Sequence, residues 1–244
     1  MAYLHGDSPP VPQQVKSPEQ IRKPIPVSRD STKYILQDDA SYPEGWDLEH
    51  FKNLPSFKKR VAYAREKLAH IGSGSSRIVF DVDPNTVLKL ARNKKGLAQN
   101  TLEAEISDQG YHPDLVTQVH GHDAEYLWIE AEKARKMKKS EFQAINGYNF
   151  DIFGKVLVNE MRKERGHKHG TYYVDPEVAR QIYNDDFFEK VMNFTKAYDL
   201  TAGDLARQSS WGIVNRSGKD ITVIIDYGVS QDIYKDFYIR GRTL

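Results

Sequence analysis

The sequence predicts an α+β protein with two lobes: a small antiparallel sheet comes first and a mainly helical half follows. Three observations carry this prediction. β-Branched runs separated by turns fill much of residues 70–130, helical patterns fill most of residues 131–198, and a second hairpin follows at residues 211–225. Strands first, then helices and a closing hairpin, are typical of an α+β body rather than of alternating α/β units.

The composition excludes several classes of function. The chain has 244 residues and no cysteine, so it can bury a sizeable core but offers no disulfide, thiolate metal site or cysteine nucleophile. The formal charge of +1 gives no overall attraction to nucleic acid or to an anionic membrane. The polar, proline-containing start is unlike a signal peptide, and no apolar stretch approaches the roughly 20 residues of a membrane span. We therefore expect a cytoplasmic protein (in the host cytoplasm if viral), without a membrane or nucleic-acid partner.

The first 45 residues differ from the rest of the chain. They hold seven of the 11 prolines, mixed with polar residues and almost no apolar periodicity. Such a segment buries too little apolar surface to offset its ordering entropy. We expect an extended or disordered N-terminal arm over residues 1–45, either free or docked on a protein partner or on the body. The body then divides into a first lobe, residues 46–130, and a second lobe, residues 131–244.

The first lobe is expected to begin with a helix and continue as a sheet. Apolar residues at helical spacing predict a helix over residues 51–69. A glycine turn then leads into a hairpin formed by the runs up to residue 80 and from residue 86 to 90. The pattern predicts a further helix over residues 96–108 and two short strands over residues 113–120 and 125–130.

The second lobe is expected to be mainly helical up to its closing hairpin. Ser140 with Gln143 resembles a capping box, Asp151 caps an amphipathic run through residue 161, and Asp175-Pro176 opens a helical pattern. That pattern continues to about residue 198, with a possible break at residues 185–186. The hairpin pairs residues 211–215 with residues 221–225 and ends on Asp226.

Five features follow one another in an order that suits phosphoryl transfer. They are a glycine turn at residues 72–74, the strand lysine Lys89, a glutamate on the next helix, and the acids Asp204 and Asp226. A glycine turn lets backbone N–H groups approach phosphates, a lysine supplies positive charge that a glutamate holds in place, and two acids can position a nucleophile and a metal ion. Each feature is weak evidence alone, so their order is what carries the argument.

In this order the chain resembles the protein-kinase-like superfamily, which includes protein kinases and aminoglycoside-phosphotransferase-like enzymes. It is similar to short kinase-like proteins of phage and bacterial type. The resemblance implies a minimal two-lobed kinase fold that binds the nucleotide ATP and Mg²⁺ between the lobes. It also implies Mg²⁺-dependent phosphoryl transfer to a hydroxyl acceptor, protein or small molecule, that the sequence does not identify.

The resemblance assigns nucleotide-binding roles in the first lobe. Arg77 stands where the family has its third glycine, and Lys89 is expected to contact the phosphates. Its partner is Glu103 or Glu105: both lie about 80° from the centre of the buried helix face, and the resemblance alone favours Glu103. The segment from residue 128 to 132 is expected to bind adenine through its backbone. The expected cofactor-binding residues are Gly72, Ser73, Gly74, Val79, Lys89, Glu130 and Glu132.

The second lobe is expected to supply the acceptor and metal residues. Asp204, in Gly-Asp-Leu, would orient the acceptor hydroxyl, and Asp226, in Asp-Tyr-Gly, would bind Mg²⁺. Ser209 stands where the family has an asparagine metal ligand, and only 16 residues follow Gly228, which predicts a truncated second lobe. These two departures leave an alternative, in which the protein is a catalytically degenerate kinase-like binding or regulatory protein, possibly phage-encoded, that docks through its N-terminal arm.

Overall fold

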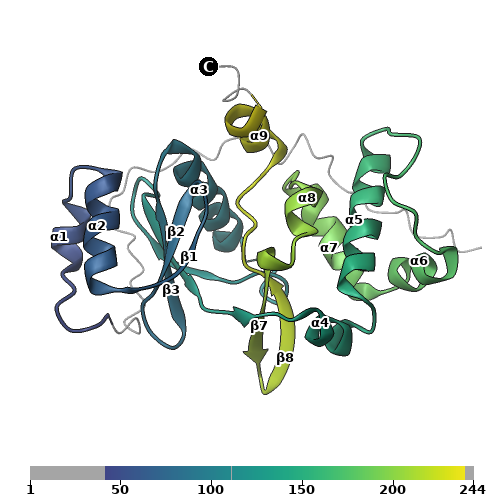
Figure 1. Cartoon of the computed structure of the whole chain (residues 1–244), viewed down its shortest axis with the longest axis horizontal. Helices are drawn as coiled ribbons and strands as arrows, with labels where there is room; N and C mark the ends of the chain where they lie inside the picture. Colours follow the sequence, from purple (N-terminus) through teal and green to yellow (C-terminus); the bar gives the residue numbers. More distant parts are fainter. Residues whose placement is uncertain (1–41, 111, 240–244) are drawn as a thin grey trace, which may run out of the picture. The chain divides into compact units, whose positions relative to one another are not determined.

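Two antiparallel sheets and a set of helices form the part of the chain that the computed structural model describes, residues 42–110 and 112–239 (Figure 1). These residues belong to one unit that spans residues 31–244. The α+β class expected from the sequence is confirmed. The arm expected over residues 1–45 lies outside the described residues except for its last four positions.

The first sheet has five strands in the order β1-β2-β3-β5-β4. Val79 lies opposite Lys89 in the β2–β3 pairing, so these two side chains share a face of the sheet. Ile78, Phe80 and Leu88 alternate with them and point to the other face. The strands are β1 (Ala69–Ser73), β2 (Arg77–Asp81), β3 (Thr86–Ala91), β4 (Val119–His122) and β5 (Trp128–Glu132).

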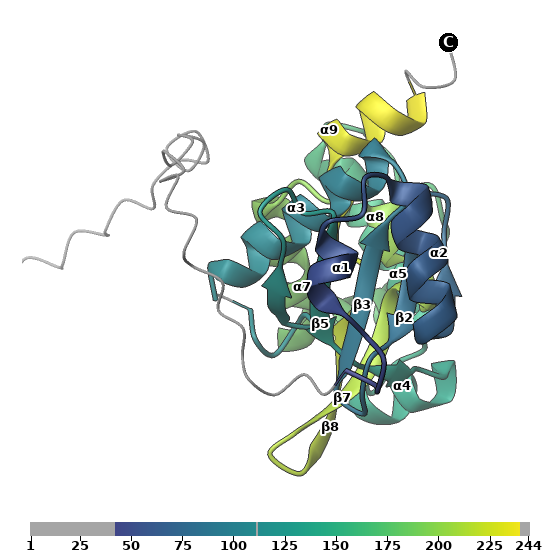
Figure 2. The same cartoon turned by 90° about the vertical axis from the view of Figure 1, so that its left-hand side faces the viewer.

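Two short helices, α1 (Leu48–Lys52) and α2 (Phe57–Lys67), cover one face of this sheet (Figure 2). The single helix expected over residues 51–69 is therefore wrong. Pro55 separates the two helices because it cannot continue the first one, and the Ser56 side chain accepts a hydrogen bond from Lys59 N–H at 3.3 Å to start the second. The buried apolar residues between these helices and the sheet are Phe51, Ala64, Leu68, Ile78, Phe80, Val82, Leu88, Leu90 and Trp128.

Helix α3 (Lys94–Asp108) packs on the opposite face of the sheet, the face that carries Lys89. It confirms the helix expected over residues 96–108 and begins two residues earlier, where the Asn93 side chain accepts the Gly96 N–H at 3.1 Å. Gly96 is required by packing, since a Cβ there would lie 2.1 Å from the Ser76 carbonyl oxygen. The turn between β1 and β2 thus rests directly on the start of α3.

The strands expected over residues 113–120 and 125–130 are shifted in the structure. Leu115 and Val116 do not join the five-stranded sheet; they run beside Ile224, whose N–H donates to the Leu115 carbonyl at 2.8 Å. β4 begins only at Val119, and β5 ends at Glu132, two residues later than expected. The contact between Leu115 and Ile224 connects the loop after α3 to the closing hairpin.

The helices of the second half begin only in part at the expected caps. Asp151 is not a cap, because the Asn149 side chain accepts its N–H at 2.8 Å and the helix begins at Phe150. Asp175 and Asp185 cap consecutive helices, so the break expected at residues 185–186 is confirmed. The first helix starts at Lys139 instead of following a Ser140–Gln143 box, because the Glu141 carboxylate accepts the Lys138 N–H at 2.8 Å. The helices are α4 (Lys139–Asn146), α5 (Phe150–Glu164), α6 (Pro176–Tyr183), α7 (Asp186–Ala197) and α8 (Ala202–Leu205).

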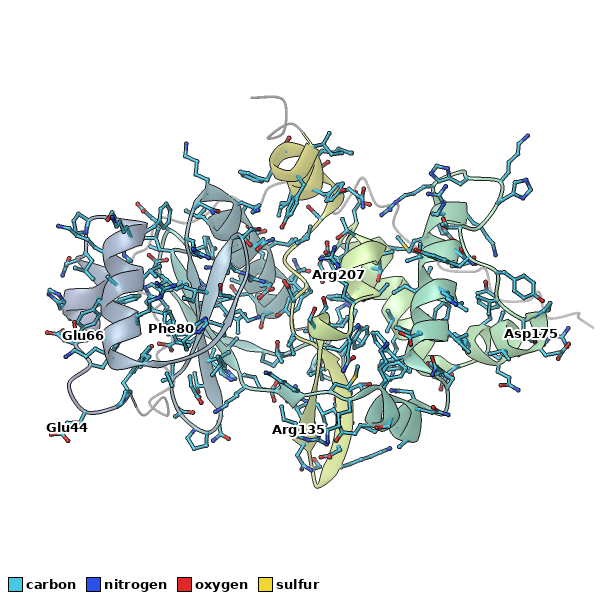
Figure 3. The ribbon with its side chains drawn as sticks, in the orientation of Figure 1. Glu44, Glu66, Phe80, Arg135, Asp175 and Arg207 are labelled. Atoms are coloured by element: carbon cyan, nitrogen blue, oxygen red, sulfur yellow. The ribbon has the colours of Figure 1, made fainter. Side chains whose placement is uncertain are left out.

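A core rich in aromatic rings holds these helices against the second sheet. Phe142, Phe150 and Phe153 each pack within 6.4 Å of the Trp211 ring, centroid to centroid, and all four rings are buried. Phe80 (labelled in Figure 3) belongs to the separate core under α2. The core that contains Trp211 also includes Ile106, Leu115 and Val116, which precede the boundary expected at residue 130.

The closing hairpin forms as expected and belongs to the second sheet, in the order β6-β7-β8. Ser217 and Gly218 both have positive φ, 53° and 83°, as a two-residue type I′ turn requires. The strands are β6 (Arg135–Lys136), β7 (Trp211–Arg216) and β8 (Lys219–Ile224), and the described chain ends with α9 (Gln231–Tyr234) and a π-helical turn at Lys235–Ile239. Of the helices described, none combines the length and apolarity needed to cross a bilayer.

Candidate functional site

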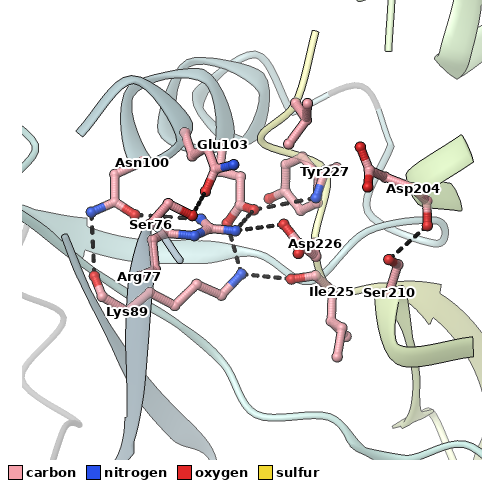
Figure 4. Close-up of polar contacts among 12 residues, drawn as sticks. Ser76, Arg77, Lys89, Asn100, Glu103, Asp204, Ser210, Ile225, Asp226 and Tyr227 are labelled. Carbon is pink, nitrogen blue, oxygen red and sulfur yellow. Dashed lines mark hydrogen bonds and ion pairs between the residues drawn. The ribbon is translucent and has the colours of Figure 1, made fainter. Parts of the chain in front are cut away.

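Four charged side chains from distant parts of the chain meet beside the first sheet (Figure 4). Lys89 Nζ lies 2.7 Å from one carboxylate oxygen of Glu103, and the Arg77 guanidinium lies 2.8 Å from the other. The same guanidinium nitrogen lies 2.6 Å from Asp226 Oδ1. We call Arg77, Lys89, Glu103 and Asp226 the charge cluster.

Each member of the charge cluster is placed by its own element. Arg77 lies two residues before Val79 on β2, so strand alternation puts it on the face that carries Lys89. Helix α3 lies over this face and presents Glu103. Asp226 follows the end of β8, and the Ile225 carbonyl accepts a hydrogen bond from Lys89 Nζ at 2.7 Å. The closing hairpin is thereby joined to the first sheet.

Burial makes the charges of the cluster interdependent. Glu103 has no exposed surface, and its burial would raise the pKa of that carboxyl, but Arg77 and Lys89 outweigh burial and lower it to about 2. Burial lowers the pKa of Lys89, and Glu103 partly restores it. For Arg77, Glu103 and Asp226 outweigh burial and raise the pKa. Glu103 is therefore a carboxylate at neutral pH.

The structure distinguishes the two glutamates that the sequence left open. Glu103 pairs with Lys89, whereas Glu105, on the same helix, is exposed. Glu103 also accepts the backbone N–H of Tyr227 at 3.2 Å, and the Tyr227 hydroxyl donates to the Thr117 carbonyl at 2.7 Å. The Asp-Tyr-Gly segment is therefore fixed to both α3 and the loop that follows it.

The glycine turn is tied to α3 by its own backbone. The Gly74 N–H donates to the Arg77 carbonyl at 2.9 Å, and the Gly74 carbonyl accepts from Arg92 at 2.9 Å. The Ser75 carbonyl accepts from Asn93 at 2.9 Å. Gly72 and Ser73 end β1, paired with β2, and Val79 lies beside Lys89 on the shared face. The turn thus adjoins the charge cluster.

Asp204 lies on a separate short helix, α8. Its carboxylate accepts hydrogen bonds from Thr201 Oγ1 at 2.5 Å and pairs with Arg207, labelled in Figure 3, at 3.1 Å. Its carbonyl accepts from buried Ser210 at 2.8 Å, while Ser209 is exposed on the 3₁₀ turn Gln208–Ser210. In the described part of the chain, no hydrogen bond or ion pair joins Asp204 to the charge cluster (Figure 4).

The residues expected to hold Mg²⁺ do not form a metal site in this arrangement. Asp226 is paired with Arg77, and none of the described hydrogen bonds or ion pairs brings Ser209 to Asp226. Nowhere in residues 42–110 and 112–239 do three His, Asp or Glu side chains gather in a group that could hold a metal ion. The carboxylate that the resemblance assigns to a metal has an arginine as its partner.

Two expected nucleotide-binding residues point away from the cluster. Glu130 lies opposite Leu88, so its side chain is on the far face of the sheet, where the Tyr42 hydroxyl donates to it. The Glu132 carboxylate pairs with Arg216 at 2.8 Å, and the backbone N–H of Glu132 donates to the Gln118 carbonyl. Residues 128–132, which we expected to bind adenine through their backbone, form strand β5, with β3 on one side and β4 on the other.

Arg77 is the site residue that the sequence did not reveal. We expected it only to stand where the family has its third glycine. The alternation of side chains along β2 could have indicated its position, because an arginine two residues before Val79 lies on the same face as Lys89. Its acidic partner Asp226 lies 149 positions away, a separation that no local pattern spans.

Comparison with known proteins gives structural likeness only. No family model matches the chain, and no curated protein matches it. Among solved structures, it is similar to the GDP complex of wild-type aminoglycoside 2′-phosphotransferase-IIIa (12% identity, 75% of this chain and 77% of that chain, TM-score 0.36). It is also similar to the streptomycin–ATP ternary complex of APH(2″)-IIa (10%, 72% and 71%, 0.33) and to SAICAR-synthase from Saccharomyces cerevisiae complexed with SAICAR (12%, 72% and 83%, 0.34). These TM-scores lie below 0.5, so a function for this chain is inferred from the residues of its own site.

Proposed function

We propose that the protein is a kinase-like ATP-binding protein. The observation that carries this proposal is the buried Lys89–Glu103 pair, 2.7 Å apart, beside a glycine turn and facing Asp226. A lysine held by a buried carboxylate presents a fixed positive charge, which suits the phosphates of a nucleotide. In this proposal the glycine turn and Val79 line the nucleotide, and the lobes divide near residue 130.

Phosphoryl transfer is the reaction that we propose for this site. The oxygen of an acceptor hydroxyl would attack the γ-phosphorus of ATP as the bond from that phosphorus to the bridging oxygen breaks, giving ADP and a phosphate monoester. Asp204 would orient the hydroxyl and receive its proton, which then passes to solvent. No step is derived through Mg²⁺, because the described residues do not assemble a site for it.

Nucleotide binding is tested by titrating the full chain with ATP in a calorimeter. Lys89→Met should weaken binding at least tenfold, because a charge-assisted contact to phosphate is worth about 1.5 to 3 kcal/mol. Lys190→Met, which changes an exposed lysine on α7, is the matched control and should bind like wild type. Equal affinity of Lys89→Met and the control would refute the assignment of the nucleotide site.

Transfer is tested separately, by following the γ-phosphate of labelled ATP into protein or into added hydroxyl compounds. Asp204→Asn should abolish transfer while leaving ATP affinity within about threefold, since its role is at the acceptor. Asp226→Ala should lower transfer as well. Equal transfer by wild type and both variants would overturn the roles given to these acids.

A second candidate is a kinase-like protein that binds nucleotide and regulates a partner without transferring phosphate, with residues 1–45 as its docking segment. The Arg77–Asp226 pair and the exposure of Ser209 favour it, because neither suits a catalytic metal site. ATP binding without transfer by wild type, under every metal condition tried, would support this candidate over the enzyme.

A further inference from the structure

The guanidinium of Arg77 forms an ion pair with Asp226, the acid that the resemblance assigns to a metal ion. We propose that Arg77 takes the place of that ion, so that the site binds ATP without a divalent cation. This inference rests on the proposed ATP binding and specifies what neutralises Asp226 when the nucleotide enters.

The charge cluster is already balanced. One nitrogen of Arg77 bridges two carboxylates, 2.8 Å from Glu103 and 2.6 Å from Asp226, while Lys89 holds the other oxygen of Glu103. Two cations therefore face two anions. A divalent ion added at Asp226 would meet the guanidinium as a like charge and leave the cluster with a net positive charge. An arginine is always protonated, so the positive charge that Arg77 contributes does not depend on pH in the physiological range.

Arg77 is also fixed in position and is no mobile surface cation. Its side chain is 8% exposed, and its other terminal nitrogen donates to the Asn100 side chain at 3.4 Å. Asn100 in turn donates to the carbonyls of Lys89, at 3.3 Å, and Tyr126, at 3.0 Å. The guanidinium is thus built into the framework of the sheet and α3.

The opposite side of Asp226 stays open to a ligand. The Asp226 side chain retains 49% of its exposure, although one oxygen contacts Arg77. Asp204, the other acid of the expected site, is held by Thr201 and Arg207 and does not complete a set of metal ligands. A nucleotide can therefore approach an acid whose charge is already neutralised.

The experiment measures the ATP affinity of the full wild-type chain in excess EDTA and again in millimolar Mg²⁺, by calorimetry. Affinities that differ by less than tenfold would support the proposal. An affinity at least tenfold higher with Mg²⁺ would overturn it while leaving the proposed ATP binding intact. Absence of ATP binding under both conditions would overturn the proposed function, and this inference with it.

Variants of Arg77 supply the second measurement. Arg77→Gln removes the built-in cation, so ATP binding should become Mg²⁺-dependent by at least tenfold, whereas Arg77→Lys keeps a cation and should remain independent. Arg180→Gln, on the exposed face of α6, is the matched control and should behave like wild type. Metal independence retained in a folded Arg77→Gln protein would overturn the role of Arg77. If that variant does not fold, the wild-type comparison still decides the proposal.

Discussion

Replacing Glu103 with glutamine removes the carboxylate that holds both cations of the charge cluster. Glutamine has nearly the shape of a protonated glutamate, so the variant approximates the wild-type protein with Glu103 neutral. A carboxyl group whose pKa falls from 4.5 in the unfolded chain to about 2 in the folded one contributes about 3 kcal/mol to folding at neutral pH. This agrees with the roughly 3 to 5 kcal/mol lost when one partner of a buried ion pair is removed.

The sign of this effect sets its dependence on pH. The folded state lowers the pKa of Glu103, so the stabilisation is complete above the unfolded value of 4.5 and is lost as the pH falls toward about 2. The difference between wild type and Glu103→Gln should therefore shrink from about 3 kcal/mol at pH 7 to about 1 kcal/mol at pH 3. At pH 7, the melting temperature of the variant should be lower by about 6 to 12 °C.

Urea unfolding of wild type and variant at both pH values measures this difference. Glu105→Gln is the matched control, because it makes the same change on the same helix at an exposed position, and it should alter stability by less than about 0.5 kcal/mol. Equal losses from the two substitutions, or a loss at Glu103 that is the same at pH 7 and pH 3, would refute the reasoning.

Three further predictions concern buried residues of the fold. Gly96→Ala should lower the free energy of unfolding by about 1 to 3 kcal/mol, because the new Cβ would lie 2.1 Å from a carbonyl oxygen. Gly203→Ala is the control, since the space around Gly203 is open, and it should change the free energy of unfolding by less than about 1 kcal/mol. Urea unfolding measures both. Trp211→Phe should cost about 1 to 3 kcal/mol by the same assay, since the buried indole donates to the Leu205 carbonyl at 2.7 Å. Glu130→Gln should raise the melting temperature at pH 7 but not at pH 4, because burial raises the pKa of Glu130 and its ionised form destabilises the folded state as the pH rises.

Each of these predictions has a contrary outcome. Equal stability of the two glycine variants would contradict the close approach at Gly96. A Trp211→Phe protein as stable as wild type would show that the indole hydrogen bond contributes nothing. A lower melting temperature for Glu130→Gln at pH 7 would mean that this carboxylate is stabilising. A loss of ATP affinity in that variant would return Glu130 to the nucleotide site.

Local patterns predicted most of the elements because their causes are local. Asp175 and Asp185 cap helices through their own side chains, and the turn after β7 needs positive φ at Gly218. The errors arose where tertiary contacts outweighed pattern. The run around Leu115 and Val116 had strand composition, but it pairs with residue 224 and does not join the first sheet.

The candidate site was predictable only in part. Lys89, Asp204 and Asp226 could be identified by residue type and order. That order did not show which acidic side chains contact the lysine or the arginine. The two candidate glutamates of α3 were equivalent by helical geometry, and only the packing of the helix turned one of them, Glu103, toward Lys89. The Asp204 carboxylate instead accepts a hydrogen bond from Thr201 and pairs with Arg207, both close to it in the sequence.

Spacing along the chain was enough to predict an α+β body with a glycine turn, a strand lysine and two later acids, because these features are local. The contact between Arg77 and Asp226 is visible only in the folded chain. That contact needs the alternation of β2, the packing of α3 on the sheet and the end of β8 to coincide in space. An ion pair across 149 positions is a property of the fold, and here it determines which cation neutralises the acid.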